Sequence, residues 1–125
     1  MTREELKKRI QGTPATIPTA FDDNLQLDLG RQKDLTQWWM ENGLGTDVAA
    51  LKVAAAMGES AALSDAELPK VMRAVVDAAG KDATIICALK TKDTLNTIED
   101  AKMVQDMGAI GLQIELPMFH KPNQA

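Results

Sequence analysis

Apolar and polar residues follow two different periods along the chain, and these periods predict four strands separated by helices. Short runs rich in β-branched residues and bounded by Gly, Pro or Asp are typical of strands, and "ATIICAL" at 83–89 is the clearest. Longer runs with apolar residues three and four positions apart are typical of helices. The predicted strands span residues 13–21, 47–56, 83–89 and 109–116, and the predicted helices span a short segment from Thr2 and residues 28–42, 64–80 and 94–108.

Capping signals mark several of these helix boundaries. "TREE" at 2–5 and "SDAE" at 64–67 have the Ser/Thr-x-x-Glu spacing of a capping box, which predicts a helix start. Gly43, Gly80 and Gly108 are placed to end the three longer helices. In the second helix, we expect one side to pack against the rest of the protein; that side carries Leu29, Leu35, Trp38 and Trp39.

The order β-α-β-α-β-α-β predicts parallel strands joined by right-handed helical crossovers. Two α/β architectures fit this order, an open doubly wound sheet or part of a (β/α)8 TIM barrel. A complete barrel takes about 250 residues, and four βα units in 125 residues amount to half of one. We therefore predict a single partial domain over residues 1–125, the N-terminal half of a barrel.

Alternation along the strands places charged residues on one face of the predicted sheet. One face of each strand is bulky and apolar, and the other carries small residues together with Lys52, Lys90, Gln113 and Glu115. Three interpretations remain open: an internal ion pair of Lys52 or Lys90 with Glu115, a polar pocket for an anionic substrate, or a bulge that inverts the alternation. Lys90 ends its strand, where barrel active sites form, and is the better functional candidate.

Composition and charge narrow the range of partners and cofactors. The net charge of -4 and pI of about 4.9 argue against a nucleic-acid or anionic-membrane surface. One Cys, Cys87, and one His, His120, are too few for a zinc site, and no phosphate-binding glycine motif is present, so we expect no metal and no cofactor. No apolar run reaches the length of a membrane span, and the first residues lack a signal-peptide core, which predicts a cytoplasmic protein.

Four segments, in order and at fitting separations, resemble the dihydrodipicolinate synthase/N-acetylneuraminate lyase family of pyruvate-dependent aldolases. The resemblance runs from about residue 12 to residue 124. The matching segments are "PTAFDDNLQLD" at 18–28, "GESAALSDAE" at 58–67, "TLNTIEDAKMVQDMGAIGLQI" at 94–114 and "PMFHKPNQ" at 117–124.

The resemblance implies a (β/α)8 barrel, usually an oligomer, that acts on pyruvate or a related 2-oxo acid. A lysine on the sixth strand of the family forms a Schiff base with the oxo group, and a tyrosine on the fifth strand relays a proton. This chain ends after the fourth predicted strand, so no residue here receives a catalytic role. We expect the chain alone to be inactive, and to be part of a longer chain or a self-associating half-barrel.

The resemblance also implies which residues bind substrate. The family's two threonines before Gly-Glu-Ser correspond to Ala56 and Met57, and the second tyrosine of its Pro-Tyr-Tyr corresponds to Phe119. Thr19 lies in the first matched segment, and Lys90 is placed to replace lost carboxylate contacts. Two functions compete, a divergent lyase acting on a 2-oxo acid and a non-catalytic binding or scaffold protein; an unrelated small α/β domain is a third possibility.

Overall fold

The computed structural model describes residues 1–45, 47–90 and 92–115. Four parallel strands form one sheet in the order β1-β2-β3-β4, which confirms the predicted parallel α/β fold. The elements are α1 (Arg3–Arg9), β1 (Thr13–Thr16), α2 (Leu29–Glu41), β2 (Ala49–Val53), two short 3₁₀ turns η1 (Ala56–Gly58) and η2 (Ser60–Ala62), α3 (Leu68–Ala79), β3 (Ile85–Leu89), α4 (Thr94–Asp106) and β4 (Gly111–Ile114).

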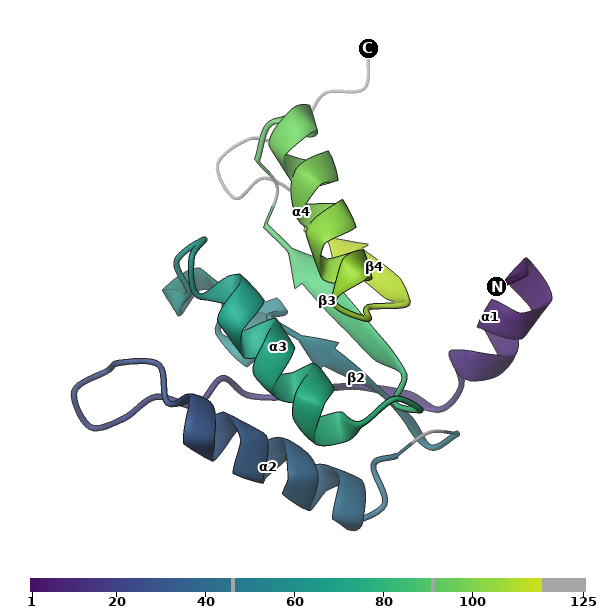
Figure 1. The fold of residues 1–125 in the computed structure, drawn as a ribbon, viewed down its shortest axis with the longest axis horizontal. Coiled ribbons are helices and arrows are strands. Elements are labelled where there is room, and N and C mark those ends of the chain that lie inside the picture. Colours follow the sequence, from purple (N-terminus) through teal and green to yellow (C-terminus); the bar gives the residue numbers. More distant parts are fainter. Residues whose placement is uncertain (46, 91, 116–125) are drawn as a thin grey trace.

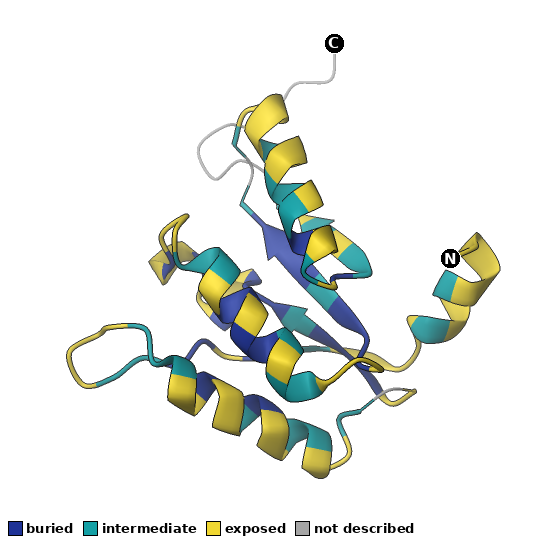
Figure 2. Ribbon diagram, in the orientation of Figure 1, coloured by how far each residue is buried: buried dark blue, intermediate teal, exposed yellow. Residues whose placement is uncertain are grey.

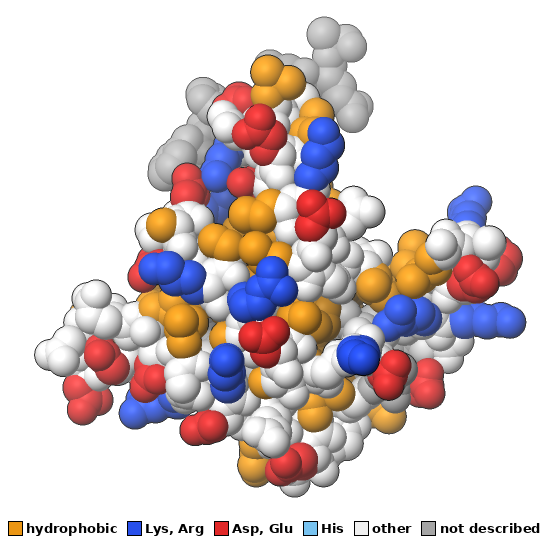
Figure 3. All heavy atoms as spheres, in the orientation of Figure 1, with side chains coloured by type: hydrophobic (Ala, Val, Ile, Leu, Met, Phe, Trp, Pro, Cys, Tyr) orange, Lys and Arg blue, Asp and Glu red, His pale blue; other side chains and the backbone are white. Residues whose placement is uncertain are grey.

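The three longer helices lie on one face of the sheet, and α1 lies apart from them at the amino-terminal ends of the strands (Figure 1). The predicted capping box closes the start of α1, where Thr2 and Glu5 hydrogen-bond reciprocally. The end of α1 is tied to the start of β3, since the Thr84 hydroxyl donates to the carbonyl of Arg9 at 3.1 Å. On the helix face, Lys and Arg side chains alternate with Asp and Glu over α2 and α3 (Figure 3), so no basic patch forms there.

The core lies between the sheet and the helices, as the predicted alternation requires. Leu51 and Val53 of β2 pair in register with Ile85 and Cys87 of β3, and all four are at most 2% exposed. The inward sides of α2 and α3 are buried against them, and the outward sides are exposed (Figure 2). The predicted assignment of alternating residues to a helix-side face and a polar face is therefore correct, and no bulge inverts the alternation in β2 or β3.

β4 follows the same alternation, but its helix-side face is uncovered. Leu112 and Ile114 are 43% and 51% exposed, although they share the face of the buried residues of β3. Parallel sheets are normally covered on this face by crossover helices, and no described helix follows β4. The sheet therefore ends in an apolar edge.

Two element boundaries differ from the predicted ones for local reasons. The first strand stops at Thr16 because residues 18–20 turn away and bond to α2 instead of to β2. The third helix starts at Leu68, four residues late, because Ser64 bonds through both its backbone N–H and its hydroxyl to the Glu67 carboxylate. That carboxylate reaches back as in a capping box, but helical geometry begins only after it.

The packing side of α2 also differs from the prediction. Trp38 is 58% exposed, so its assignment as a packing residue is wrong, whereas Trp39 and Leu35 pack against the core. The fully buried residues of α2 are the polar Gln32 and Thr36. Thr36 is satisfied within the helix, since its hydroxyl donates to the carbonyl of Gln32 at 2.8 Å.

Candidate functional site

A cleft opens at the carboxyl ends of β2 and β3, beside the N-terminal ends of α3 and α4. It contains about 290 Å³ of empty space, including the part open to solvent. Small side chains, Ala54 and Ala88, form its sheet side, and most of the polar lining comes from the loops that follow the strands. The lining residues are Ala54, Ser60, Leu63, Ser64, Asp65, Leu68, Ala88, Lys90, Lys92 and Asp100.

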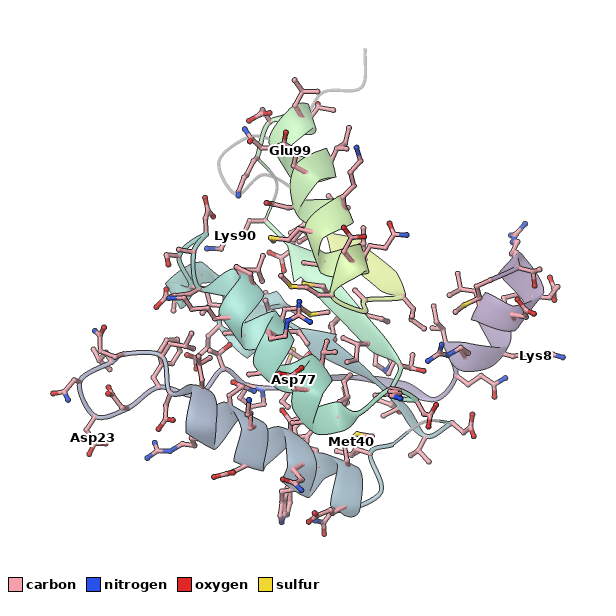
Figure 4. All side chains as sticks on the ribbon, in the orientation of Figure 1. Lys8, Asp23, Met40, Asp77, Lys90 and Glu99 are labelled. Atoms are coloured by element: carbon pink, nitrogen blue, oxygen red, sulfur yellow. The ribbon has the colours of Figure 1, made fainter. Side chains whose placement is uncertain are left out.

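Lys90 closes one side of this cleft. Its side chain extends from the end of β3 toward the loop before α3 (Figure 4), where the ammonium donates to the carbonyl of Leu63 at 2.5 Å. Lys90 is half-buried. Its partner is a neutral carbonyl oxygen, so the positive charge of Lys90 is not compensated by this contact.

Polar residues of β4 reach across β3 to groups on and after β2. The Lys52 ammonium donates to Oε1 of Gln113 at 3.0 Å, and the backbone N–H of Ala56 donates to Oε1 of Glu115 at 3.0 Å. Ala88 pairs with Gln113 and presents only a methyl group, which leaves room for these contacts over the middle strand. The polar residues predicted to share one face of the sheet thus form a network of hydrogen bonds there.

The internal ion pair, one of the three interpretations that the sequence left open, does not form among the described residues. Neither Lys52 nor Lys90 has a carboxylate oxygen within 4.0 Å in the described part of the chain. Lys90 and Glu115 lie side by side, directly after the paired residues Leu89 and Ile114, yet each bonds to a neutral backbone group. Two ammonium groups and one carboxylate therefore share this face without pairing.

Lys92 lies two residues from Lys90 and behaves differently. Its ammonium is 2.8 Å from a carboxylate oxygen of Asp100 and 3.2 Å from one of Asp65. The hydrogen bond to Asp100 is the main reason that the pKa of Lys92 is raised above its ordinary value, and the bond to Asp65 adds to it. Lys92 is thus an ion-paired link between the loop before α3 and α4.

The turn 56–58 at the edge of the site is held by tight backbone contacts. The Thr19 hydroxyl donates to the carbonyl of Gly58 at 2.7 Å, and the N–H of Gly58 donates to the carbonyl of Ala55 at 2.7 Å. A Cβ on residue 58 would lie 2.9 Å from the carbonyl oxygen of Ile17, closer than real Cβ atoms approach. Glycine at this position therefore allows the turn to pack against the end of β1.

The structure brings some predicted site residues together and separates others. Lys90 lines the cleft, and Ala56 presents its N–H to Glu115. Thr19 is buried and holds the turn through Gly58. Met57 is 86% exposed and does not line the cleft, and Phe119 lies outside the described residues.

Sequence reasoning missed two contacts that shape the site. The amide of Gln32 accepts from the N–H of Ala20 at 2.9 Å and donates to the carbonyl of Pro18 at 3.2 Å, which fixes the segment that carries Thr19. The only sequence signal was a glutamine at an inward helical position. The contact of Glu115 with Ala56 had no local signal, since the residues are far apart along the chain.

Other chemical possibilities are limited in the described part of the chain. No group of three His, Cys, Asp or Glu side chains there could hold a metal ion. No described helix is both long and apolar enough to cross a membrane. Burial raises the pKa of the Cys87 thiol to about 12, with a smaller contribution from Asp100, so this cysteine is a neutral core residue and no nucleophile.

The sheet is parallel, carries helices on one face and has its polar cleft at the carboxyl ends of the strands. These features define the fold class as part of a (β/α)8 barrel. The chain belongs to the dihydrodipicolinate synthetase family, whose model matches residues 9–125. This confirms the resemblance that the four sequence segments indicated.

Individual relatives agree with this assignment. A 4-hydroxy-tetrahydrodipicolinate synthase of Cutibacterium acnes is 34% identical over 113 residues, which cover 90% of this chain and 37% of that protein. A crystal structure of dihydrodipicolinate synthase matches with a TM-score of 0.79 and 26% identity, over 91% of this chain and 38% of that one. The N-acetylneuraminate lyase of Proteus mirabilis shares the fold, with a TM-score of 0.80 and 21% identity over 93% of this chain and 38% of that one. The chain thus spans little more than a third of the length of these relatives.

Proposed function

We propose that this chain is the N-terminal part of a divergent lyase or aldolase that acts on a 2-oxo acid through a Schiff base. The imine-forming lysine lies outside this chain, on a later strand of the barrel, and residues 1–125 supply part of the substrate-binding site. The substrate is a small-molecule 2-oxo acid. We also propose that the protein is cytoplasmic and has no nucleic-acid partner, as its net charge of -4 favours.

One observation carries the proposal beyond family membership, namely two lysine ammonium groups on the polar face of the sheet that form no salt bridge in the described part of the chain. Lys52 and Lys90 donate to an amide oxygen and to a backbone carbonyl, both neutral. A substrate carboxylate adds a Coulombic attraction to an ammonium that a neutral oxygen does not offer, so it can compete for these donors. Lys90, at the cleft and at the end of its strand, is the expected carboxylate-binding residue.

The reaction must differ from that of the family in its proton transfers. Ala56 and Met57 stand where the resemblance places two threonine hydroxyls, and neither side chain can relay a proton. Loss of a general acid–base group typically costs about 10²–10⁴-fold in rate. We therefore propose a different 2-oxo acid or aldehyde substrate, and not the unchanged synthase reaction.

Trapping with borohydride tests the proposal. The full-length gene product is incubated with pyruvate, so that a lysine amine adds to the oxo carbon with loss of water, and sodium borohydride then reduces the C=N bond to a stable secondary amine. Mass spectrometry is expected to show the reduced adduct on a lysine beyond residue 125. Residues 1–125 alone are expected to give no adduct.

A non-catalytic binding or scaffold protein is the second candidate, and the contact between Glu115 and Ala56 favours it. A backbone N–H at the site is already occupied by a carboxylate of the chain itself. A folded full-length protein without any reduced adduct, despite measurable pyruvate binding, would support this candidate over the lyase.

The open edge of the sheet supports an assembled state in either case. Leu112 and Ile114 expose apolar surface that a following helix or a second copy would cover. We propose that these side chains are buried in the working protein, either in a longer chain or in a homo-oligomer.

A further inference from the structure

Glu115 occupies an unusual place among the charged residues of the site. Glu115 follows the residue paired with Leu89 and so neighbours Lys90 in register, but its carboxylate accepts from the N–H of Ala56 at 3.0 Å and the Lys90 ammonium donates elsewhere. Its own backbone N–H donates to the carbonyl of Leu89 at 3.2 Å, which fixes the residue at the end of β3. The side chain is only partly exposed. A fixed negative charge therefore faces the same end of the sheet as the two lysines.

We propose that Glu115 determines the specificity of this site by charge. It keeps the amide of Ala56 from binding an anionic ligand, and it leaves Lys90 as the group that binds the ligand's carboxylate. This inference rests on the proposed function, since it concerns the same 2-oxo acid site. It adds that the preferred substrate is a monocarboxylate whose other end carries a hydroxyl or another hydrogen-bond donor, which Glu115 can accept.

Like charges at short range repel each other at this site. A ligand carboxylate that reached for the amide of Ala56 would have to displace the carboxylate of Glu115 or lie next to it. Two like charges about 5 Å apart in a partly buried site repel strongly enough to weaken binding by about tenfold or more. A hydroxyl or amine at that position instead donates to the free lone pairs of Glu115.

Glu115→Gln isolates this charge. The amide oxygen of glutamine can still accept from the N–H of Ala56, so the contact across β3 is kept while the negative charge is removed. We expect the variant to bind 2-oxoglutarate, whose second carboxylate can reach toward the amide of Ala56, about tenfold more tightly than the unaltered full-length protein. Its affinity for pyruvate should stay unchanged, because the single carboxylate of pyruvate binds Lys90. An effect on folding alone would change the affinities for both ligands equally.

Three further variants complete the measurement, which uses isothermal titration calorimetry on the full-length protein. Glu99→Gln makes the same change in net charge at an exposed position of α4 (Figure 4), and Lys33→Met removes a lysine on α2; both should leave pyruvate binding unchanged. Lys90→Met should weaken pyruvate binding about tenfold or more.

The outcomes separate this inference from the function on which it rests. If Lys90→Met weakens pyruvate binding and Glu115→Gln does not change the affinity for 2-oxoglutarate, the anion site stands and the role of Glu115 is refuted. If Glu115→Gln tightens 2-oxoglutarate binding and no adduct is trapped with borohydride, Glu115 has the proposed role and the Schiff-base function is wrong. Absence of pyruvate binding in every form overturns both.

Discussion

Gln32 offers the sharpest test of how the fold positions the site. Its side chain is fully buried on α2, and its amide holds the N–H of Ala20 at 2.9 Å and the carbonyl of Pro18 at 3.2 Å. These bonds fix the chain on either side of Thr19, whose hydroxyl in turn supports the turn at Gly58. Gln32→Met keeps nearly the same volume and removes both bonds, so it measures their contribution without opening a large cavity.

The expected cost follows from the burial of the two backbone groups. Ala20 is 8% exposed, so its N–H would be left without a partner, which costs about 1–3 kcal/mol. Pro18 is exposed, so its carbonyl can bond to water and its loss costs only about 1 kcal/mol. Together these terms predict a loss of about 2–4 kcal/mol in the free energy of unfolding for Gln32→Met. Gln32→Ala should lose about 1–2 kcal/mol more through its cavity.

Urea denaturation followed by tryptophan fluorescence measures this loss, since Trp38 and Trp39 lie on the same helix. Gln26→Met is the matched control, because Gln26 is exposed in the loop before α2 and its side-chain amide makes only a 3.5 Å contact, with the carbonyl of Asn24. A Gln32→Met protein within 0.5 kcal/mol of the unaltered one would refute the reasoning, because the amide would then contribute nothing that methionine packing does not replace.

Two further predictions concern the core and the open edge. Burial raises the pKa of Cys87 to about 12, so the folded protein keeps a proton that the unfolded chain releases above about pH 9. The free energy of unfolding should therefore fall by up to about 1.4 kcal/mol per pH unit between pH 9 and pH 12. Comparison with Cys87→Ala in urea titrations checks this: equal slopes for the two proteins would contradict it. Leu112→Lys with Ile114→Lys should reduce self-association of residues 1–125 in analytical ultracentrifugation, and an unchanged sedimentation coefficient would show that the edge of β4 is not where copies meet.

The fold was predictable because each strand and helix carries its own local signal. "ATIICAL" has the β-branched run of a buried strand, and β3 forms within it. The alternation of Leu51 and Val53 with Lys52 predicted the buried and polar faces of β2 correctly. The helical period of apolar residues did not predict that α2 buries polar side chains. Gln32 is buried for its hydrogen bonds and not for its hydrophobicity.

The candidate site was predictable in its members and not in its contacts. Lys52, Lys90, Gln113 and Glu115 do share one face, as their positions along the strands required. Opposite charges on one face indicated an ion pair, but the choice of partner depends on side-chain direction and on loop position. The carbonyl of Leu63 and the N–H of Ala56 come from loops that no strand period describes.

The separation of these charges follows from the small residues between them. Ala54 and Ala88 leave the middle of the polar face open, so Gln113 reaches over β3 to Lys52 and satisfies its ammonium without a second charge. Glu115, one step further along β4, meets the backbone of Ala56 in the same way. A larger residue at 88 would block these crossings and force Glu115 toward Lys90, its neighbour in register. The alanines of this chain therefore keep Lys90 at the cleft without a salt bridge to any described carboxylate, as the proposed anionic substrate would require.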